Sequence, residues 1–273
     1  MGVFRWDGEH LAAELPHGAR ALFTTRRGGV STGPFASLDL GRTDPALERD
    51  DPEAVAENRR RAEAAAGGRP LRIARQVHAT GIATDDDPEA VAENRRRAAA
   101  AAGGRPLRIA RQVHATGIAT DEDPAPEADG QVTRADDVAA TVLVADCLPV
   151  AIAAPGGVAM VHAGWRGLAA GILRRGVAAL GDGPKAAAIG PGIGVCCYEV
   201  GDEVRAAFAD HPGARRGRNL DLKLAARQQL RAAGVAEIED CDLCTACDPE
   251  RFFSHRRDGD DTGRQAGIAW RVR

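Results

Sequence analysis

The sequence lacks any apolar run long enough to cross a membrane. No stretch approaches the roughly 20 consecutive apolar residues that a transmembrane helix needs. The N-terminal residues MGVFRWDGEHLAAEL contain no basic segment followed by an apolar core, which is the pattern of a secretory leader. We therefore expect a soluble, cytoplasmic protein with no membrane partner.

The chain also lacks an excess of positive charge. Its 39 acidic residues outnumber its 36 Lys and Arg residues, which gives a formal net charge of −3. A protein that binds nucleic acid through a basic face needs the opposite balance, because it must attract the phosphate backbone. We therefore expect no nucleic-acid partner.

Cysteine is scarce as well. Six Cys residues in a chain of 273 are too few for a disulfide scaffold, so we expect reduced thiols. Three of them form the segment CDLCTAC at 241–247, whose spacing resembles part of a zinc or iron–sulfur motif. This segment offers no fourth ligand, so we interpret its cysteines as small, buried and reduced.

What the chain does contain is enough apolar sequence for a substantial core. With 44% hydrophobic residues we expect one domain over residues 1–273. Short apolar runs bounded by Pro or Gly predict strands, and apolar residues at helical spacing predict helices. The predicted strands include 142–144, 150–153, 158–161 and 187–189, and the predicted helices include 168–180, 204–208 and 220–233.

A tandem repeat interrupts the first half of the chain. Asp51–Asp86 and Asp87–Glu122 match at 34 of 36 positions. Each copy contains an amphipathic helix pattern, EAVAENRRRA, followed by a strand pattern, LRIARQVHAT. Two copies are too few for a solenoid, so we interpret the repeat as a recent duplication in which one copy is surplus to the core.

The segment 141–167, TVLVADCLPVAIAAPGGVAMVHAGWRG, places a Cys and a His at the ends of neighbouring apolar runs. A turn at 155–157 reverses the chain, so Cys147 and His162 are expected to meet. The repeated Gln-Val-His offers a third ligand, at either His78 or His114. Two His and one Cys form a three-ligand set like that of catalytic zinc. We favour His114, because its copy runs directly into the Cys147 strand.

Three arginines lie in segments suited to anion binding. Arg26 is in the glycine-rich loop TTRRGGVS, Arg166 follows His162 in GWRG, and Arg257 is in FFSHRRDG. Planar guanidinium donors suit phosphate and carboxylate groups. Either Asp129 or Asp146 is the carboxylate expected to orient a histidine ligand.

Nine short segments spread along the chain carry a family resemblance: TTRRGGVS, GPFASLDLG, AENRRR, QVHATG, EADGQVT, VADCLPV, VHAGWRG, IGPGIGVCCYEVG and FFSHRRDGDDTGRQ. In this order they resemble segments of the YfiH-like family. Members of this family were long described as laccase-domain multicopper polyphenol oxidases and are now described as purine nucleoside phosphorylases. Two features depart from the family pattern: Asp39 stands where relatives have Asn, and the repeat has no counterpart.

The resemblance implies a single α/β (α+β) domain of layered mixed sheets flanked by helices. It implies a zinc-dependent enzyme that phosphorolyses adenosine, inosine and methylthioadenosine and deaminates adenosine. The positions that match the metal ligands and catalytic residues are His114, Cys147 and His162. Zinc in such a site can lower the pKa of a bound water toward about 7, which suits deamination. Phosphorolysis needs a bound phosphate instead, for which we expect Arg26, Arg166 and Arg257.

Other functions remain open at the level of sequence. One alternative is a Cys-His hydrolase with Cys147 as nucleophile and His162 as base, acting on cell-wall peptides or in peptidoglycan editing. Another is a copper-dependent polyphenol oxidase, although two Met and seven His are few ligands for several copper ions. A third is a zinc-stabilised binding protein without turnover. The residues do not distinguish between nucleosides or between oligomeric states.

Overall fold

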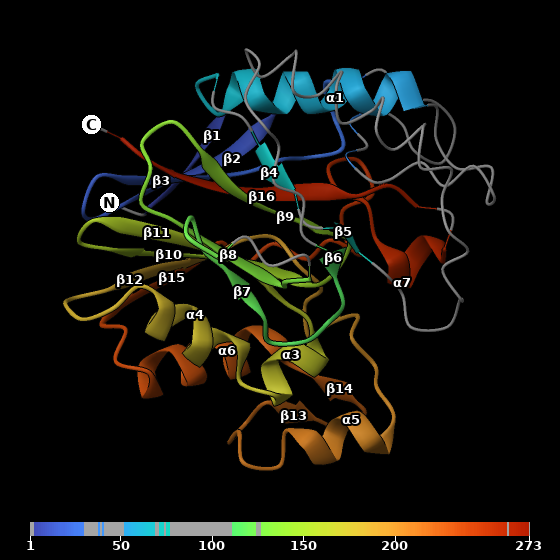
Figure 1. Ribbon diagram of the computed structural model, residues 1–273. Helices are drawn as coiled ribbons and strands as arrows, with labels where there is room; N and C mark the ends of the chain where they lie inside the picture. The colour runs from blue at the N-terminus through green and yellow to red at the C-terminus, as the bar shows by residue number, and fades with distance from the viewer. Residues whose placement is uncertain are drawn as a thin grey trace.

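The computed structural model describes residues 3–29, 38, 40, 52–68, 71–73, 75–76, 111–123, 127–260 and 262–272 (Figure 1). His78 and Asp39 lie outside the described residues. Across these ranges, no helix combines the length and the apolar character needed to cross a membrane.

Two six-stranded sheets form the centre of the molecule. The first has the order β1-β2-β3-β16-β9-β4, in which β4 is parallel to β9 and every other pair is antiparallel. Its strands are β1 (Phe4–Asp7), β2 (His10–Leu15), β3 (Ala19–Phe23), β16 (Gln265–Arg271), β9 (Ala139–Val144) and β4 (Leu71–Ile73). The C-terminal strand β16 therefore lies between β3 and β9, which joins the N-terminal hairpins to the rest of the chain.

The second sheet has the order β15-β12-β10-β11-β8-β7. Its outer pairs, β15 with β12 and β7 with β8, are parallel, and its inner pairs are antiparallel. Its strands are β15 (Glu237–Asp240), β12 (Ala186–Ile189), β10 (Leu148–Ala154), β11 (Gly157–Ala163), β8 (Gly130–Thr133) and β7 (Ile118–Ala119). Both sheets are thus mixed, as the resemblance implied.

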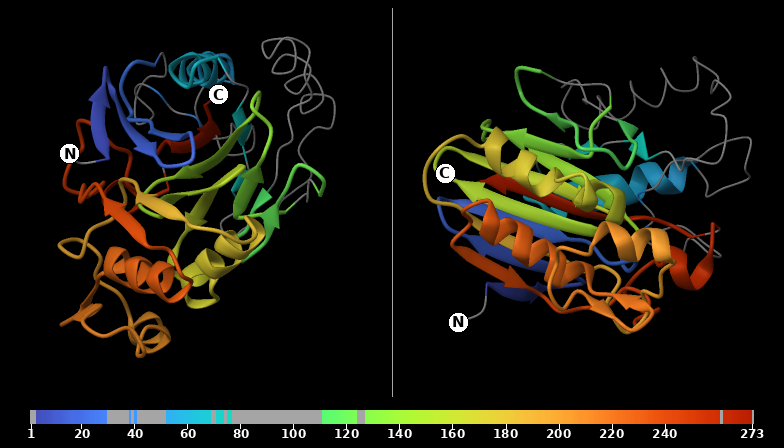
Figure 2. Two further views of the ribbon diagram at one scale, coloured as in Figure 1. Left: turned by 90° about the vertical axis from the view of Figure 1, so that its left-hand side faces the viewer. Right: turned by 90° about the horizontal axis from the view of Figure 1, so that it is seen from below.

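The two sheets pack face to face and helices cover their outer faces (Figures 1 and 2). Strand β10 shows why its sequence is apolar throughout: Val150 and Ile152 contact the helices, whereas Ala151 and Ala153 face the first sheet. The helices on the second sheet are α3 (Trp165–Ala169), α4 (Ile172–Ala179) and α6 (Leu222–Ala232), and α1 (Pro52–Ala65) covers the first sheet. The order of layers is therefore helix, sheet, sheet, helix.

Shorter elements lie around this core. They are α5 (Asp202–Ala207), α7 (His255–Asp258), β5 (Arg75–Gln76), β6 (Arg111–Gln112), β13 (Arg215–Arg216) and β14 (Asn219–Leu220). The single helix predicted over 168–180 is wrong. The chain forms α3 and α4 instead, because Gly171 adopts a left-handed conformation with φ 83° between them.

The two copies of the repeat supply different parts of the fold. The first copy provides α1, β4 and β5, and the second provides β6 and the segment 111–122 that follows into the site. Strands β5 and β6 are the same Arg-Gln dipeptide from each copy, and they pair in parallel. In the described part of the repeat, the helix therefore comes from one copy and the histidine loop from the other.

Removing residues 75–110 is expected to leave a folded protein that keeps its site. The deletion joins Ala74 to Arg111 and restores one LRIARQVHAT segment. Helix α1 and β4 precede the junction and His114 follows it, so the shorter chain retains these parts. The shorter connection should change the free energy of unfolding by about 1 kcal/mol or less. Urea denaturation and metal analysis test this, and loss of cooperative unfolding would show that residues 75–110 belong to the core.

Candidate functional site

The hairpin formed by β10 and β11 places a cysteine beside a histidine. Cys147 immediately precedes β10, and His162 is the penultimate residue of β11, opposite Pro149. His162 therefore lies within the strand, not beyond its end as the sequence suggested. It shares a face of β11 with Val158 and Met160, which pack between the two sheets, so its imidazole is buried.

His114 reaches the same place from the loop after β6. The preceding Gln112 is fully buried, and its side chain donates to the carbonyl of Leu143 and accepts from the Leu143 amide. This pair of bonds attaches the loop to β9. His114 itself has φ 58°, a left-handed conformation that non-glycine residues adopt at an energetic cost and that is common at functional sites.

The fully buried carboxylate of Asp129 holds both histidines in position. Its Oδ1 accepts the amide of His114 at 3.0 Å and lies 2.8 Å from Nδ1 of His162. Its Oδ2 accepts the amides of Val113 at 3.1 Å and Ala115 at 2.8 Å. The sequence named Asp129 and Asp146 as alternatives for this role, and the structure assigns it to Asp129.

The three side chains converge on one point. The ligand atoms of His114, Cys147 and His162 all lie within 4.8 Å of one another. The two imidazole rings are 4.8 Å apart at an interplanar angle of 73°. Gly164 makes this approach feasible, since a Cβ at that position would lie 2.9 Å from Cys147 Sγ and 3.2 Å from Cδ2 of His114.

The charges at this cluster favour a thiolate. Burial alone would raise the pKa of Cys147, but the neighbouring His162 and His114 lower it to about 6. Burial would lower the pKa of His162, but Cys147 and Asp129 raise it to about 9. Burial would likewise raise the pKa of Asp129, and the bonds from His162 and the loop amides lower it instead. The thiolate is the form in which cysteine both binds metals and acts as a nucleophile.

These residues fit a metal ion. A carboxylate can only accept, so Nδ1 of His162 carries a proton and Nε2 is the ring nitrogen left to bind a metal ion. That Nε2 atom is buried and has no hydrogen-bond partner in the described part of the chain. Two imidazoles and a thiolate are the donors that zinc uses in open sites, and they also suit copper. The cluster can therefore bind a metal with one position left for another ligand.

Replacing Gly164 by Ala is expected to disrupt this cluster. The added methyl group would contact both Cys147 and His114, so one ligand must move and metal affinity should fall by at least about tenfold. Gly201 is a matched control: both glycines precede helices with φ near −70°, and nothing lies within 4 Å of a Cβ at Gly201. Zinc titration of both variants tests this, and equal affinities would contradict it.

Two of the three expected anion-binding arginines lie together, outside the metal-ligand cluster. Arg26 stacks over the ring of Phe253 at 4.6 Å and donates to the carbonyl of Pro249. Burial and the nearby charge of Arg257 lower the pKa of Arg26. The guanidinium of Arg257 donates to the Asp258 carboxylate and to the carbonyls of Thr245, Ala246 and Phe252. Phosphate binding by Arg257 remains a prediction. To bind phosphate, its guanidinium must replace some of these hydrogen bonds with bonds to the anion.

Arg166 lies closer to the cluster, in the first turn of α3, two residues after Gly164. Its side chain is exposed and its guanidinium lies 4.5 Å from the ring centre of Trp165. Tyr198 faces the same region: burial raises the pKa of its phenol, and so does the Cys147 thiolate, whereas Arg256 and Arg166 lower it. The Arg256 guanidinium lies 5.1 Å from the Tyr198 ring centre. Sequence reasoning assigned no role to Tyr198 or Arg256, although both stand in segments that carried the family resemblance.

Asp146, next to Cys147, fixes the other side of the site. It has φ 86°, a second left-handed non-glycine residue beside the cluster. Its carboxylate accepts the hydroxyl of Thr245 and the amide of Arg256, both at 2.6 Å. The segments around Thr245 and Arg256 are thereby attached to the residue that precedes the metal ligand.

The family model described as multi-copper polyphenol oxidoreductase laccase matches this chain in two segments, 20–85 and 79–272. The two segments together span residues 20–272 and overlap at 79–85, near the end of the first copy of the repeat.

Relatives and solved structures agree with this match. A purine nucleoside phosphorylase of Pseudomonas aeruginosa is 38% identical over 93% of this chain and 94% of its own length. Purine nucleoside phosphorylase YfiH of Escherichia coli is 34% identical, over 94% and 96%. The crystal structure of YlmD from Geobacillus stearothermophilus superposes with a TM-score of 0.76, at 31% identity and over the full length of both chains. Matches of this extent, on a chain with the same layered fold, show that this protein belongs to the YfiH-like family.

Proposed function

We propose that this protein is a zinc-dependent purine nucleoside phosphorylase that acts on adenosine, inosine and methylthioadenosine and also deaminates adenosine. The observation that carries the proposal is the convergence of His114, Cys147 and His162 around a free, buried imidazole nitrogen. The names of the relatives supply the reaction class. The relatives from Pseudomonas aeruginosa and Escherichia coli, which match more than nine tenths of this chain, are both named purine nucleoside phosphorylases. We further propose that it acts in the cytoplasm on free nucleosides and phosphate.

Zinc bound by these residues would supply a Lewis acid at the nucleoside and a water of lowered pKa for deamination. The chain's own contribution is to hold the ligands rigidly. Asp129 orients the His162 ring through Nδ1, which leaves Nε2 for the metal, and it fixes the His114 loop, while Gly164 leaves room for the thiolate. Such preorganisation means that the site does not have to rearrange during the reaction.

Phosphorolysis requires a second group of residues. A phosphate oxygen forms a bond to C1′ while the bond from C1′ to the purine breaks and the purine takes up a proton. The phosphate must be held below C1′ as this happens, and of the three expected arginines the exposed Arg166 is the closest in sequence to the cluster. The aromatic side chains of Trp165 and Tyr198 lie in the same region and suit stacking against a purine.

The central test is an assay of base release from a nucleoside panel with and without phosphate. Adenosine, inosine and methylthioadenosine should release free base only when phosphate is present, and adenosine should yield inosine without it. Release that is independent of phosphate would indicate a hydrolase, and the absence of turnover would leave a binding protein. Metal analysis of the same sample shows whether activity follows zinc content.

Replacing Arg166 by Ala is expected to raise the KM for phosphate by at least about tenfold, because a charge-assisted hydrogen bond to the anion is lost. Deamination of adenosine should change much less, since it binds no phosphate. The control is Arg175→Ala, which replaces an exposed arginine of the neighbouring α4. This substitution should leave both activities unchanged. Equal loss of both activities in the Arg166 variant would show that it binds the nucleoside instead.

A Cys-His hydrolase is the second candidate, because the opposite pKa shifts of Cys147 and His162 also describe a nucleophilic thiolate beside an imidazolium. Such an enzyme needs no zinc and should be inactivated by thiol alkylation after metal removal. The description of the matching family model suggests a further candidate, copper-dependent phenol oxidation. An assay of the copper-loaded protein with a phenolic substrate tests this candidate.

A further inference from the structure

A second group of sulfur atoms lies apart from the cluster described above. The side chains of Cys196, Cys197, Cys244 and Cys247 converge from two loops that are far apart in sequence, and their four Sγ atoms lie within 4.8 Å of one another. Cys247 Sγ is 3.4 Å from Cys196 Sγ and 3.3 Å from Cys197 Sγ. All four thiols are free. The CDLCTAC segment thus contributes two sulfur atoms, with Cys241 outside the cluster, and the loop after β12 contributes the other two.

The sulfur separations fit a single tetrahedral metal ion. Zinc bound to four thiolates at about 2.3 Å holds the sulfur atoms about 3.8 Å apart. A disulfide would bring two of them to about 2.0 Å. An iron–sulfur cluster distributes its thiolates over several iron atoms and so needs a wider group of sulfur atoms than this one. The two-residue spacing from Cys244 to Cys247 is also typical of structural zinc sites.

The backbone brings the two loops together independently of any ion. Gly192 and Cys244 form a parallel bridge, and the Thr245 amide donates to the Gly192 carbonyl. The Gly194 amide donates to Cys244 Sγ at 3.2 Å. A Cβ at Gly194 would lie 3.1 Å from both Cys196 Sγ and the Cys244 Cβ, so a side chain there would require these atoms to shift by a few tenths of an ångström. Amide-to-sulfur bonds of this kind orient thiolate ligands in metal sites.

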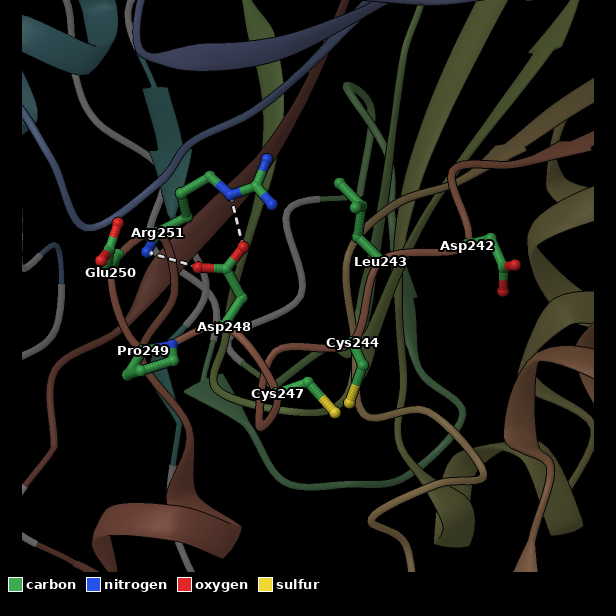
Figure 3. A pocket seen from close by; sticks show the side chains of 8 residues that line it. All are labelled: Asp242, Leu243, Cys244, Cys247, Asp248, Pro249, Glu250 and Arg251. Atoms are coloured by element: carbon green, nitrogen blue, oxygen red, sulfur yellow. Dashed lines mark hydrogen bonds and ion pairs between the residues drawn. The ribbon is translucent and has the colours of Figure 1, made fainter.

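The surroundings of the cluster are open on one side. Figure 3 shows the sulfur atoms of Cys244 and Cys247 pointing toward each other at the edge of a pocket formed by residues 242–244 and 247–251. Cys196 and Cys247 are exposed, and Cys197 and Cys244 are partly buried. The expectation that the cysteines of CDLCTAC are buried is therefore wrong for Cys247. Exposed thiols this close together would be readily oxidised if nothing held them.

We propose that Cys196, Cys197, Cys244 and Cys247 bind one zinc ion in a closed, structural site with four thiolate ligands. The ion joins the loop after β12 to the loop after β15. The latter carries Thr245, whose hydroxyl donates to Asp146 beside Cys147, and whose carbonyl accepts from Arg257. The second zinc therefore stabilises one wall of the first site without taking part in its chemistry. This proposal does not depend on the nucleoside reaction.

Zinc analysis of the purified full-length protein tests the proposal. The wild type should contain two zinc ions per chain, and Cys244→Ser or Cys247→Ser should contain one. Cys241→Ser is the matched control, because Cys241 lies in the same segment but outside the cluster, and it should keep both. Cys147→Ser should also contain one, since it affects only the first site. Equal zinc in Cys244→Ser and in the wild type would overturn the proposal.

A second measurement does not rely on a folded cysteine variant. In His162→Ala loaded with cobalt(II), the remaining ion should show the intense thiolate-to-metal absorption of a tetrahedral site with four sulfur ligands. In the zinc-loaded wild type, the exposed Cys196 and Cys247 should react with a thiol reagent only after a chelator is added. Immediate reaction without chelator, stoichiometric iron, or an intact mass that shows a disulfide would each overturn the zinc site.

Discussion

Replacing Cys147 by Ser or His162 by Ala is expected to remove about one zinc ion per chain and to lower phosphorolysis by more than about 100-fold. Loss of a residue that only supports a ligand already costs about 10–100-fold in metal affinity or activity, and loss of a ligand should cost more. Each change leaves two protein ligands, of which neither can replace the missing one. Elemental analysis after gel filtration, together with the phosphate-dependent assay, measures both effects.

His211 provides the control for this prediction. It is a partly buried histidine whose ring lies 3.0 Å from the side chain of Gln229 and which belongs to neither sulfur-containing cluster. Its replacement by Ala should leave the zinc content unchanged. Full zinc occupancy in both Cys147→Ser and His162→Ala would show that the metal, if the protein binds one, is held elsewhere.

The local part of this site could be predicted from sequence. The turn at 155–157 and the flanking apolar runs require β10 and β11 to be antiparallel neighbours, which brings Cys147 and His162 together. The preference for His114 followed from chain continuity, and the structure places His114 in the cluster. Metal binding by these residues remains a proposal, but the approach of Cys147 to His162 was readable because one tight hairpin connects them.

The long-range parts could not be predicted in the same way. Cys196 and Cys247 are 51 residues apart, and the parallel pairing of β12 with β15, continued by the bridge between Gly192 and Cys244, brings their loops together. The interactions of Arg257 depend on the turn of α7, which directs its guanidinium to backbone carbonyls instead of solvent. Hydrophobic periodicity reports which face of an element is buried, but it contains no information about which distant loop covers that face.

Replacing Asp129 by Asn is expected to weaken zinc binding by about 10–100-fold while preserving size and shape. Each carboxylate oxygen of Asp129 accepts two bonds in the structure, from three loop amides and from His162. An asparagine has one acceptor oxygen, so its NH2 group must face two donors whichever way it is oriented. Either the His114 loop or the His162 ring therefore loses its support. Zinc titration with a competing chelator measures the affinity.

Asp121 is the matched control for this change. Its carboxylate accepts the amide of Arg134 and lies 3.3 Å from the hydroxyl of Thr133, at the end of β8 opposite Asp129. Asp121→Asn should therefore cause a comparable local disturbance without affecting zinc affinity. If both variants bind zinc as tightly as the wild type, the positions of His114 and His162 are set by strand packing alone. If only Asp129→Asn binds weakly, the carboxylate is the residue that couples the second copy of the repeat to the hairpin of the site.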